Sequence, residues 1–106
     1  MRGLGDLRNL VQQAQKLQAE LAKKKEELAQ ARLEGSAGGG AVRAIVNGQG
    51  ELLQVHISPE TISEGDHQLV EDLVLAAVGE AQAKARELAQ RLMAGLTGGF
   101  PPGVAA

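Results

Sequence analysis

The chain contains no cysteine, no tryptophan and no tyrosine, and its 106 residues include a single phenylalanine, Phe100. Without cysteine there can be no disulfide bond, no thiolate metal site and no cysteine nucleophile. Aromatic side chains bury the largest area per residue, so a core built from Leu, Val, Ile and Ala is expected to be thin. A small chain with such a core buries only a modest share of its surface. The sequence therefore predicts association with another chain.

Long apolar runs are also missing. No stretch approaches the roughly 20 apolar residues that cross a bilayer, and the start of the chain lacks the apolar segment of a signal peptide. The sequence therefore predicts a cytoplasmic protein without a membrane segment.

The residue patterns of enzymes and metal sites are absent as well. His56 is predicted on the polar face of a strand and His67 at the start of a helix, and neither has metal-ligand spacing to other residues. Ser36, His56 and Asp66 have the residue types of a catalytic triad. Such combinations occur by chance in unrelated chains, so these three residues do not predict a catalytic site. The glycines at 38–40 lack the Lys-Ser/Thr pair of a phosphate-binding loop. We therefore expect no catalytic residue, no metal, no cofactor and no small-molecule substrate.

The middle of the chain has the pattern of antiparallel strands. Two short runs of alternating apolar residues flank Asn47-Gly48, a dipeptide that readily adopts the positive φ angles of a tight hairpin turn. The runs place one apolar set on one face (Val42, Ala44, Val46, Leu53, Val55 and Ile57) and a second set on the other (Arg43, Gln54 and His56). Alternation over residues 30–34 indicates a preceding strand, and the glycines at 38–40 indicate the turn between them. The sequence thus predicts a three-stranded antiparallel sheet.

Helical periodicity brackets this sheet on both sides. Leucines at alternating steps of three and four predict a helix over residues 6–29 with Asp6 as its N-cap, and we interpret this stripe mainly as core packing. A second long helix is expected to begin at a cap, Ser63 or Asp66, and to run to Leu96. A short helical turn is expected to begin at Pro59.

These elements define an α+β fold: a long N-terminal helix, three antiparallel strands joined by hairpins, and a long C-terminal helix. We expect a single domain over residues 1–97. Residues 98–106 are rich in glycine and proline and are predicted to form a flexible tail.

The net charge of −2 conceals an uneven distribution. Residues 1–32 contain seven basic and four acidic residues, residues 33–80 one and eight, and residues 81–106 three and one. Helices of about 36 and 45 Å must overhang strands of about 26 Å, and their overhanging parts are basic. A polyanion should therefore approach the helices. The predicted phosphate contacts are Lys16, Lys23, Lys24, Lys25, Lys84, Arg86 and Arg91, with Arg2 and Arg8 as further candidates.

Several segments, in this order and spacing, resemble the YbaB/EbfC family of bacterial nucleoid-associated proteins. The opening residues 3–7 and the glutamine-rich residues 12–18 resemble the family's first helix. Residues 40–42, 46–48 and 55–60 resemble its central signature, residues 71–77 the opening of its last helix, and Phe100-Pro101-Pro102-Gly103 its tail.

The resemblance implies a tweezer-like homodimer that binds double-stranded DNA in the nucleoid, alters its conformation or compaction, and affects gene expression. Since no recognition-helix pattern is visible, specificity should be weak and dominated by backbone contacts. The chain has no interleaved aromatic residues, which disfavours stacking on single strands. The alternative function is a non-catalytic adaptor dimer that binds a protein partner and no nucleic acid, which the near-neutral charge and the acidic middle favour.

Overall fold

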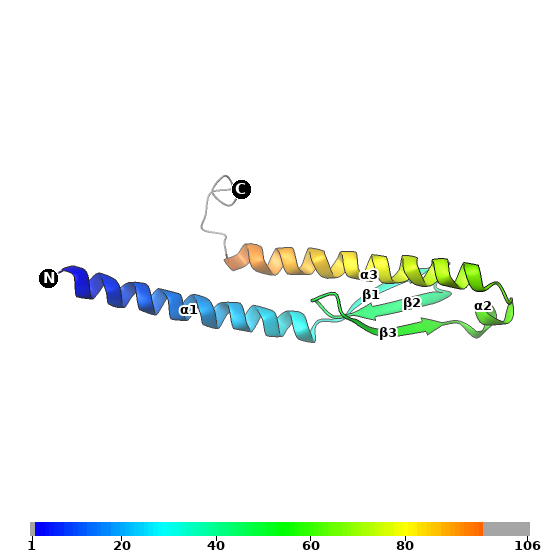
Figure 1. The fold of residues 1–106 in the computed structure, drawn as a ribbon, viewed down its shortest axis with the longest axis horizontal. Helices are drawn as coiled ribbons and strands as arrows, with labels where there is room; N and C mark the ends of the chain where they lie inside the picture. The colour runs from blue at the N-terminus through cyan, green and yellow to red at the C-terminus, as the bar shows by residue number, and fades with distance from the viewer. Residues whose placement is uncertain (1, 97–106) are drawn as a thin grey trace.

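The structure, a computed structural model, describes residues 2–96 as a small α+β core from which one long helix projects (Figure 1). The elements are α1 (Arg2–Gln30), β1 (Leu33–Ala37), β2 (Val42–Val46), β3 (Leu52–Ile57), α2 (Pro59–Ser63) and α3 (His67–Leu96). The predicted order of helix, three strands and helix is confirmed. Met1 and residues 97–106, which include the expected Gly/Pro tail, lie outside the described residues.

Helix α1 is longer than predicted at both ends. Asp6 lies within the helix, so its prediction as the N-cap was wrong: the first turn projects into solvent, where water can satisfy the free N–H groups without a capping side chain. Gln30 still belongs to α1, and its side-chain amide donates to the Glu26 carboxylate at 3.2 Å. The first strand therefore begins at Leu33, three residues later than expected.

The sheet has the order β1-β2-β3 with both pairs antiparallel, and α3 covers one face of it (Figure 1). The core residues are fully buried and small: Val42, Ala44 and Val46 from β2 and Ala77, Ala81 and Ala85 from α3. Helix and sheet are in intimate contact, because a Cβ at Gly35 in β1 would overlap the backbone of Ala77 and Ala81. Alanine and glycine at facing positions thus compensate for the missing aromatic residues by allowing close approach.

The connection between β2 and β3 differs from the predicted turn. Gly48 does not have a positive φ, and in this loop the left-handed residue is Gly50, at 84°. The side-chain oxygen of Asn47 accepts hydrogen bonds from the N–H groups of Gln49 and Glu51, both at 3.0 Å, which favours a longer loop over a two-residue turn. A bulge follows, so that Leu52 lies opposite Val46 although Gln54 lies opposite Ile45.

The two helices after the sheet begin as the sequence indicates. The Ser58 side chain caps α2, with Pro59 in its first turn. The Asp66 carboxylate accepts a hydrogen bond from the Leu69 N–H at 3.1 Å, so Asp66 is the cap of α3 and Ser63 is not. Ser63 instead ends α2, where its hydroxyl donates to the Pro59 carbonyl.

The chain is far from globular. Its extents are 78 × 27 × 16 Å and its radius of gyration is 20.9 Å, whereas a compact chain of this length would have about 13 Å. Most of α1 does not contribute to the hydrophobic core, since Leu7, Leu10 and Leu17 are each more than half exposed. The interpretation of the α1 stripe as core packing was therefore wrong within one chain, because the α1 axis leads away from the sheet.

Candidate nucleic-acid interface

Helix α1 and the C-terminal part of α3 lie side by side at the end of the molecule opposite to α2 (Figure 1). Near the end of α1, Leu28 is buried and anchors the helix to the rest of the fold. Its carbonyl oxygen accepts a hydrogen bond from the Gly48 N–H at 2.8 Å. Close approach at this point requires glycine: a Cβ at position 48 would lie 2.7 Å from the same carbonyl oxygen. The β2–β3 loop thus sets the direction in which α1 leaves the core.

An open cleft of about 360 Å³ lies where the loop meets both helices. Its polar lining includes Gln49, Gln82 and Arg86. The Gln82 side-chain amide donates to the Gly50 carbonyl at 3.2 Å and so ties the loop to α3. The sequence analysis missed the two glutamines, although Gln82 directly follows Ala81 of the buried stripe and so borders the sheet-facing side of α3.

The lysines predicted on α1 lie on the projecting helix. Lys16, Lys23 and Lys25 are exposed and form no ion pair within residues 2–96. Lys16 and Lys23 are seven residues apart, so they share one side of the helix, whereas Lys25 is about 200° around the axis from Lys23. Lys24 is different, because its side chain is only 29% exposed and its ammonium group lies 3.9 Å from the Glu27 carboxylate.

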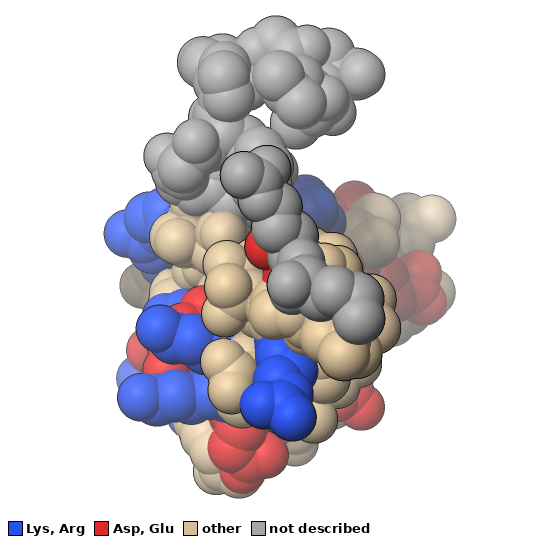
Figure 2. All heavy atoms as spheres, turned by 90° about the vertical axis from the view of Figure 1, so that its left-hand side faces the viewer, with Lys and Arg blue, Asp and Glu red and all other residues tan. Residues whose placement is uncertain are grey.

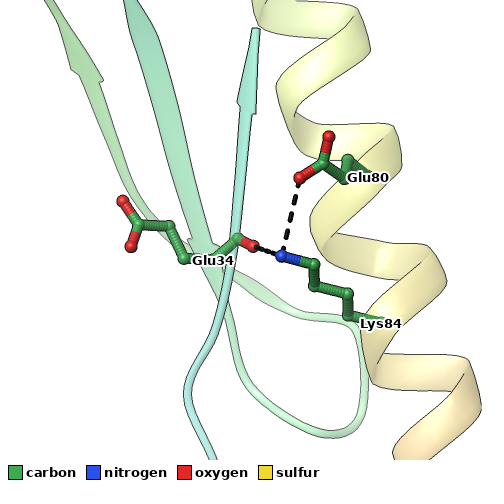
Figure 3. A network of polar contacts seen from close by, with 3 residues as sticks. All are labelled: Glu34, Glu80 and Lys84. Atoms are coloured by element: carbon green, nitrogen blue, oxygen red, sulfur yellow. Dashed lines mark hydrogen bonds and ion pairs between the residues drawn. The ribbon is translucent and has the colours of Figure 1, made fainter. Parts of the chain in front are cut away.

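Lys84 of α3 has a structural role. Its ammonium group donates to the Glu34 backbone carbonyl of β1 at 2.7 Å and lies 3.5 Å from the Glu80 carboxylate (Figure 3). Lys84 therefore lies over the sheet, and the prediction that it belongs to the overhanging part of α3 was wrong. The reason is that the core contact of α3 extends to Ala85, so the overhang begins only after that residue.

Arg86 and Arg91 are the other predicted contacts on α3. Both are exposed and unpaired within the described part of the chain. Arg86 lines the cleft, and Arg91 lies further along the overhang beside Glu87. They are about 140° apart around the helix axis. The Arg8 side chain on α1 is exposed, and that of Arg2 lies outside what the structure describes.

Apart from Lys84, the predicted residues whose side chains are described thus lie toward one end of the molecule but do not form a single flat patch. Viewed from that end, basic side chains lie mostly toward one side, with acidic side chains among them (Figure 2). Such a surface can contact phosphates through separate long side chains. Within residues 2–96 there is no group of three or more His, Cys, Asp or Glu that could hold a metal ion, and no helix there has the length and apolar character needed to cross a membrane.

Comparison with known proteins identifies a family and relatives that match nearly the whole chain. The family model described as the YbaB/EbfC DNA-binding family matches residues 3–100. Nucleoid-associated protein TTE0040 of Caldanaerobacter subterraneus subsp. tengcongensis is 45% identical over 95 residues, which span 90% of this chain and 86% of that protein. A nucleoid-associated protein of Clostridium perfringens is 46% identical over 98 residues, or 92% of this chain and 88% of the other.

The fold has a counterpart among solved structures. The crystal structure of the uncharacterized protein HP0035 from Helicobacter pylori superposes with a TM-score of 0.74 over 83% of this chain and 92% of the other, at 19% identity. The family match covers nearly the whole chain and the relatives exceed 40% identity. This chain therefore belongs to the YbaB/EbfC DNA-binding family, a family of nucleoid-associated proteins that are not enzymes.

Proposed function

We propose that this protein binds double-stranded DNA as a homodimer, through basic side chains on α1 and on the overhanging end of α3. The observation that supports this most directly is the projecting α1, which carries Lys16, Lys23 and Lys25 in solvent without ion pairs inside the described chain. Phosphates would be their partners, because unpaired lysines on a helix surface can neutralise backbone charge and release counterions.

DNA binding of this kind has weak sequence specificity. The basic residues are spread around two helices, and within residues 2–96 no short helix carries a set of basic side chains that could read base edges. Such a dimer would hold DNA by its backbone and change its path or compaction, with effects on gene expression in the nucleoid. The acidic middle of the chain, with one basic and eight acidic residues over 33–80, would keep DNA away from the sheet.

Affinity for duplex DNA is expected to fall steeply with salt. Each phosphate contact contributes about 0.9 to the slope of log K against log salt, so a dimer with about six contacts should lose about three orders of magnitude between roughly 50 and 200 mM. Fluorescence anisotropy with a labelled duplex of mixed sequence measures this slope. Absence of binding even at the lowest salt would refute DNA binding and would favour the alternative, an adaptor dimer for a protein partner.

The dimer is expected to persist at micromolar concentration. The accessible surface of the chain is 7803 Å², whereas a compact monomer of this mass would expose about 5,600 Å². The excess is larger than the surface of about 800 Å² per partner that a standard interface buries. Sedimentation equilibrium should therefore give twice the chain mass, and a folded monomer at micromolar concentration would contradict the proposal.

A further inference from the structure

Helix α1 has one continuous apolar face, which is covered over only part of its length. At 3.6 residues per turn, four leucines lie within about 40° of one another around the helix axis: Leu10, Leu17, Leu21 and Leu28. Leu28 is 5% exposed and Leu21 is partly buried. Leu17 is 52% exposed and Leu10 is 62% exposed. Within residues 2–96, the outer half of this face therefore lies open to solvent.

The covered part of the face ends where α3 ends. The two helices lie side by side and run in opposite directions (Figure 1). Leu28 and Ala89 line the same cleft. From Ala89 to Leu96, α3 advances about 11 Å along its axis, so Leu96 lies close to the level of Leu21. Leu17, the next leucine of the face, is about 6 Å further along α1, beyond the last residue of α3.

The segment that follows Leu96 has the composition of a cover for this face. Residues 97–106 contain no charged residue, and they include Phe100, the one aromatic residue of the chain, followed by Pro101-Pro102. Ten extended residues reach about 33 Å, so the segment can extend past Leu10, which lies about 17 Å beyond the level of Leu96. The prolines restrict φ and so reduce the entropy that is lost when the segment is held in place.

We propose that residues 97–106 continue past the end of α3 along the apolar face of α1 in the same chain, with the Phe100 ring against Leu17. Phe100 is four residues after Leu96, which gives it a reach of about 14 Å, enough to cross to the neighbouring helix and contact Leu17. The segment thus has a defined position, in place of the flexible tail expected from its composition.

The far end of the segment also has an apolar surface to contact. An open groove of about 240 Å³ near the start of α1 is lined by Leu4, Leu7 and Val11, among others. Leu4 is 65% exposed and Leu7 is 58% exposed. Leu7 lies about 21 Å beyond the level of Leu96, within the reach of ten extended residues. The last residues of this sequence, Val104-Ala105-Ala106, carry the small apolar side chains that such a groove can accept.

This position leaves the basic side of α1 free. Lys16 and Lys23 lie about 120° and 140° around the helix axis from the centre of the apolar face. An uncharged segment on that face neither neutralises nor repels these lysines. The same chain is favoured over a second copy as the source of the segment, because residues 97–106 begin beside the uncovered leucines and so have a high effective concentration there.

A fluorescent probe at position 100 tests the docking, because the chain has no native tryptophan. In Phe100→Trp, acrylamide should quench the indole at least threefold less in the folded protein than in guanidinium chloride. Adding Leu17→Gln should raise the quenching at least twofold. Ala19→Gln is the control, because Ala19 is exposed on the opposite side of α1 and its replacement should change nothing. Equal quenching in the folded and unfolded protein, or no response to Leu17→Gln, would overturn the docking.

Disulfide trapping identifies the chain that supplies the segment, because no native cysteine competes. Gly99→Cys combined with Leu17→Cys should form a disulfide within one chain at least fivefold faster than Gly99→Cys combined with Ala19→Cys. Non-reducing electrophoresis separates bonds within a chain from bonds between chains. Equal rates for the two pairs, or bonds formed only between chains, would refute docking in the same chain.

The single variant Leu17→Cys tests the other occupant of the face. If α1 of a second copy covers it, this variant should cross-link between chains without the cysteine at position 99, and the proposal is then wrong. Circular dichroism confirms that each variant is folded. If Leu17→Gln does not fold, the relative rates of the two cysteine pairs decide.

Discussion

Gly48→Val is expected to destabilise the fold by about 3 kcal/mol. The added side chain would be forced into a filled site, and a hydrogen bond would be broken as well. Already the Cβ would lie 2.7 Å from the Leu28 carbonyl oxygen and 2.8 Å from its Cδ2 atom. The valine would push α1 away from the loop and break the 2.8 Å hydrogen bond between them. The measurement is thermal melting followed by circular dichroism, where each kcal/mol shifts the midpoint by roughly 4–8 °C for a chain of this size.

The matched control is Gly79→Val, the same change at an exposed position of α3 with nothing within 4 Å of the added Cβ. It should leave the melting temperature unchanged or slightly higher, because glycine is the poorer helix former. If both variants melt like the parent, then α1 does not rest on the β2–β3 loop in solution.

Replacing Lys23, Lys24 and Lys25 together by glutamine should remove most of the affinity for duplex DNA, with a decrease of at least tenfold at about 0.2 M salt. The salt slope should fall by about 0.9 for every phosphate that the variant no longer neutralises. Lys23 and Lys25 are expected to carry most of the effect, since Lys24 is half-buried beside Glu27. Fluorescence anisotropy across a salt series checks the slope, and the melting temperature should change little because solvent-facing lysines contribute little to stability.

Two variants separate this surface from the rest of the chain. Arg43→Ala removes a cation on the open face of the sheet, where it pairs in register with His56, and should leave binding unchanged. Lys84→Gln should lower stability more than DNA affinity, because its ammonium group is bonded to β1. Tight binding by the triple variant combined with weak binding by Arg43→Ala would place the DNA on the sheet.

The sequence predicted most of the fold because each element has a local cause. Alternation at Val42, Ala44 and Val46 and the cap at Asp66 depend on residues close in the chain, and both predictions are confirmed. The errors have non-local causes. Asn47-Gly48 has the composition of a tight turn, yet Gly48 is needed for contact with Leu28, twenty residues earlier, and the positive φ is at Gly50.

The sequence predicted which helices carry the basic residues of the candidate site, but it predicted the positions of their side chains less well. Charge counting identified the basic helices, but it could not distinguish Lys84, which bonds to a strand fifty residues earlier, from Arg91 on the overhang. Nor could helical periodicity show whether the leucines of α1 are covered by the same chain. That depends on the direction of the helix axis, which is set by tertiary contact at Leu28.

The contact of α1 with the core at Leu28 determines how far the rest of the helix moves when it tilts. The helix from this point to its first residue is about 39 Å long, and Leu28 acts as the pivot of a lever of that length. A tilt of about 10° at the pivot would displace the tip by about 7 Å, which is comparable to the width of the minor groove of DNA, about 6 Å. Small changes in the β2–β3 loop can therefore alter the reach of the lysines while the packing of α3 on the sheet stays the same.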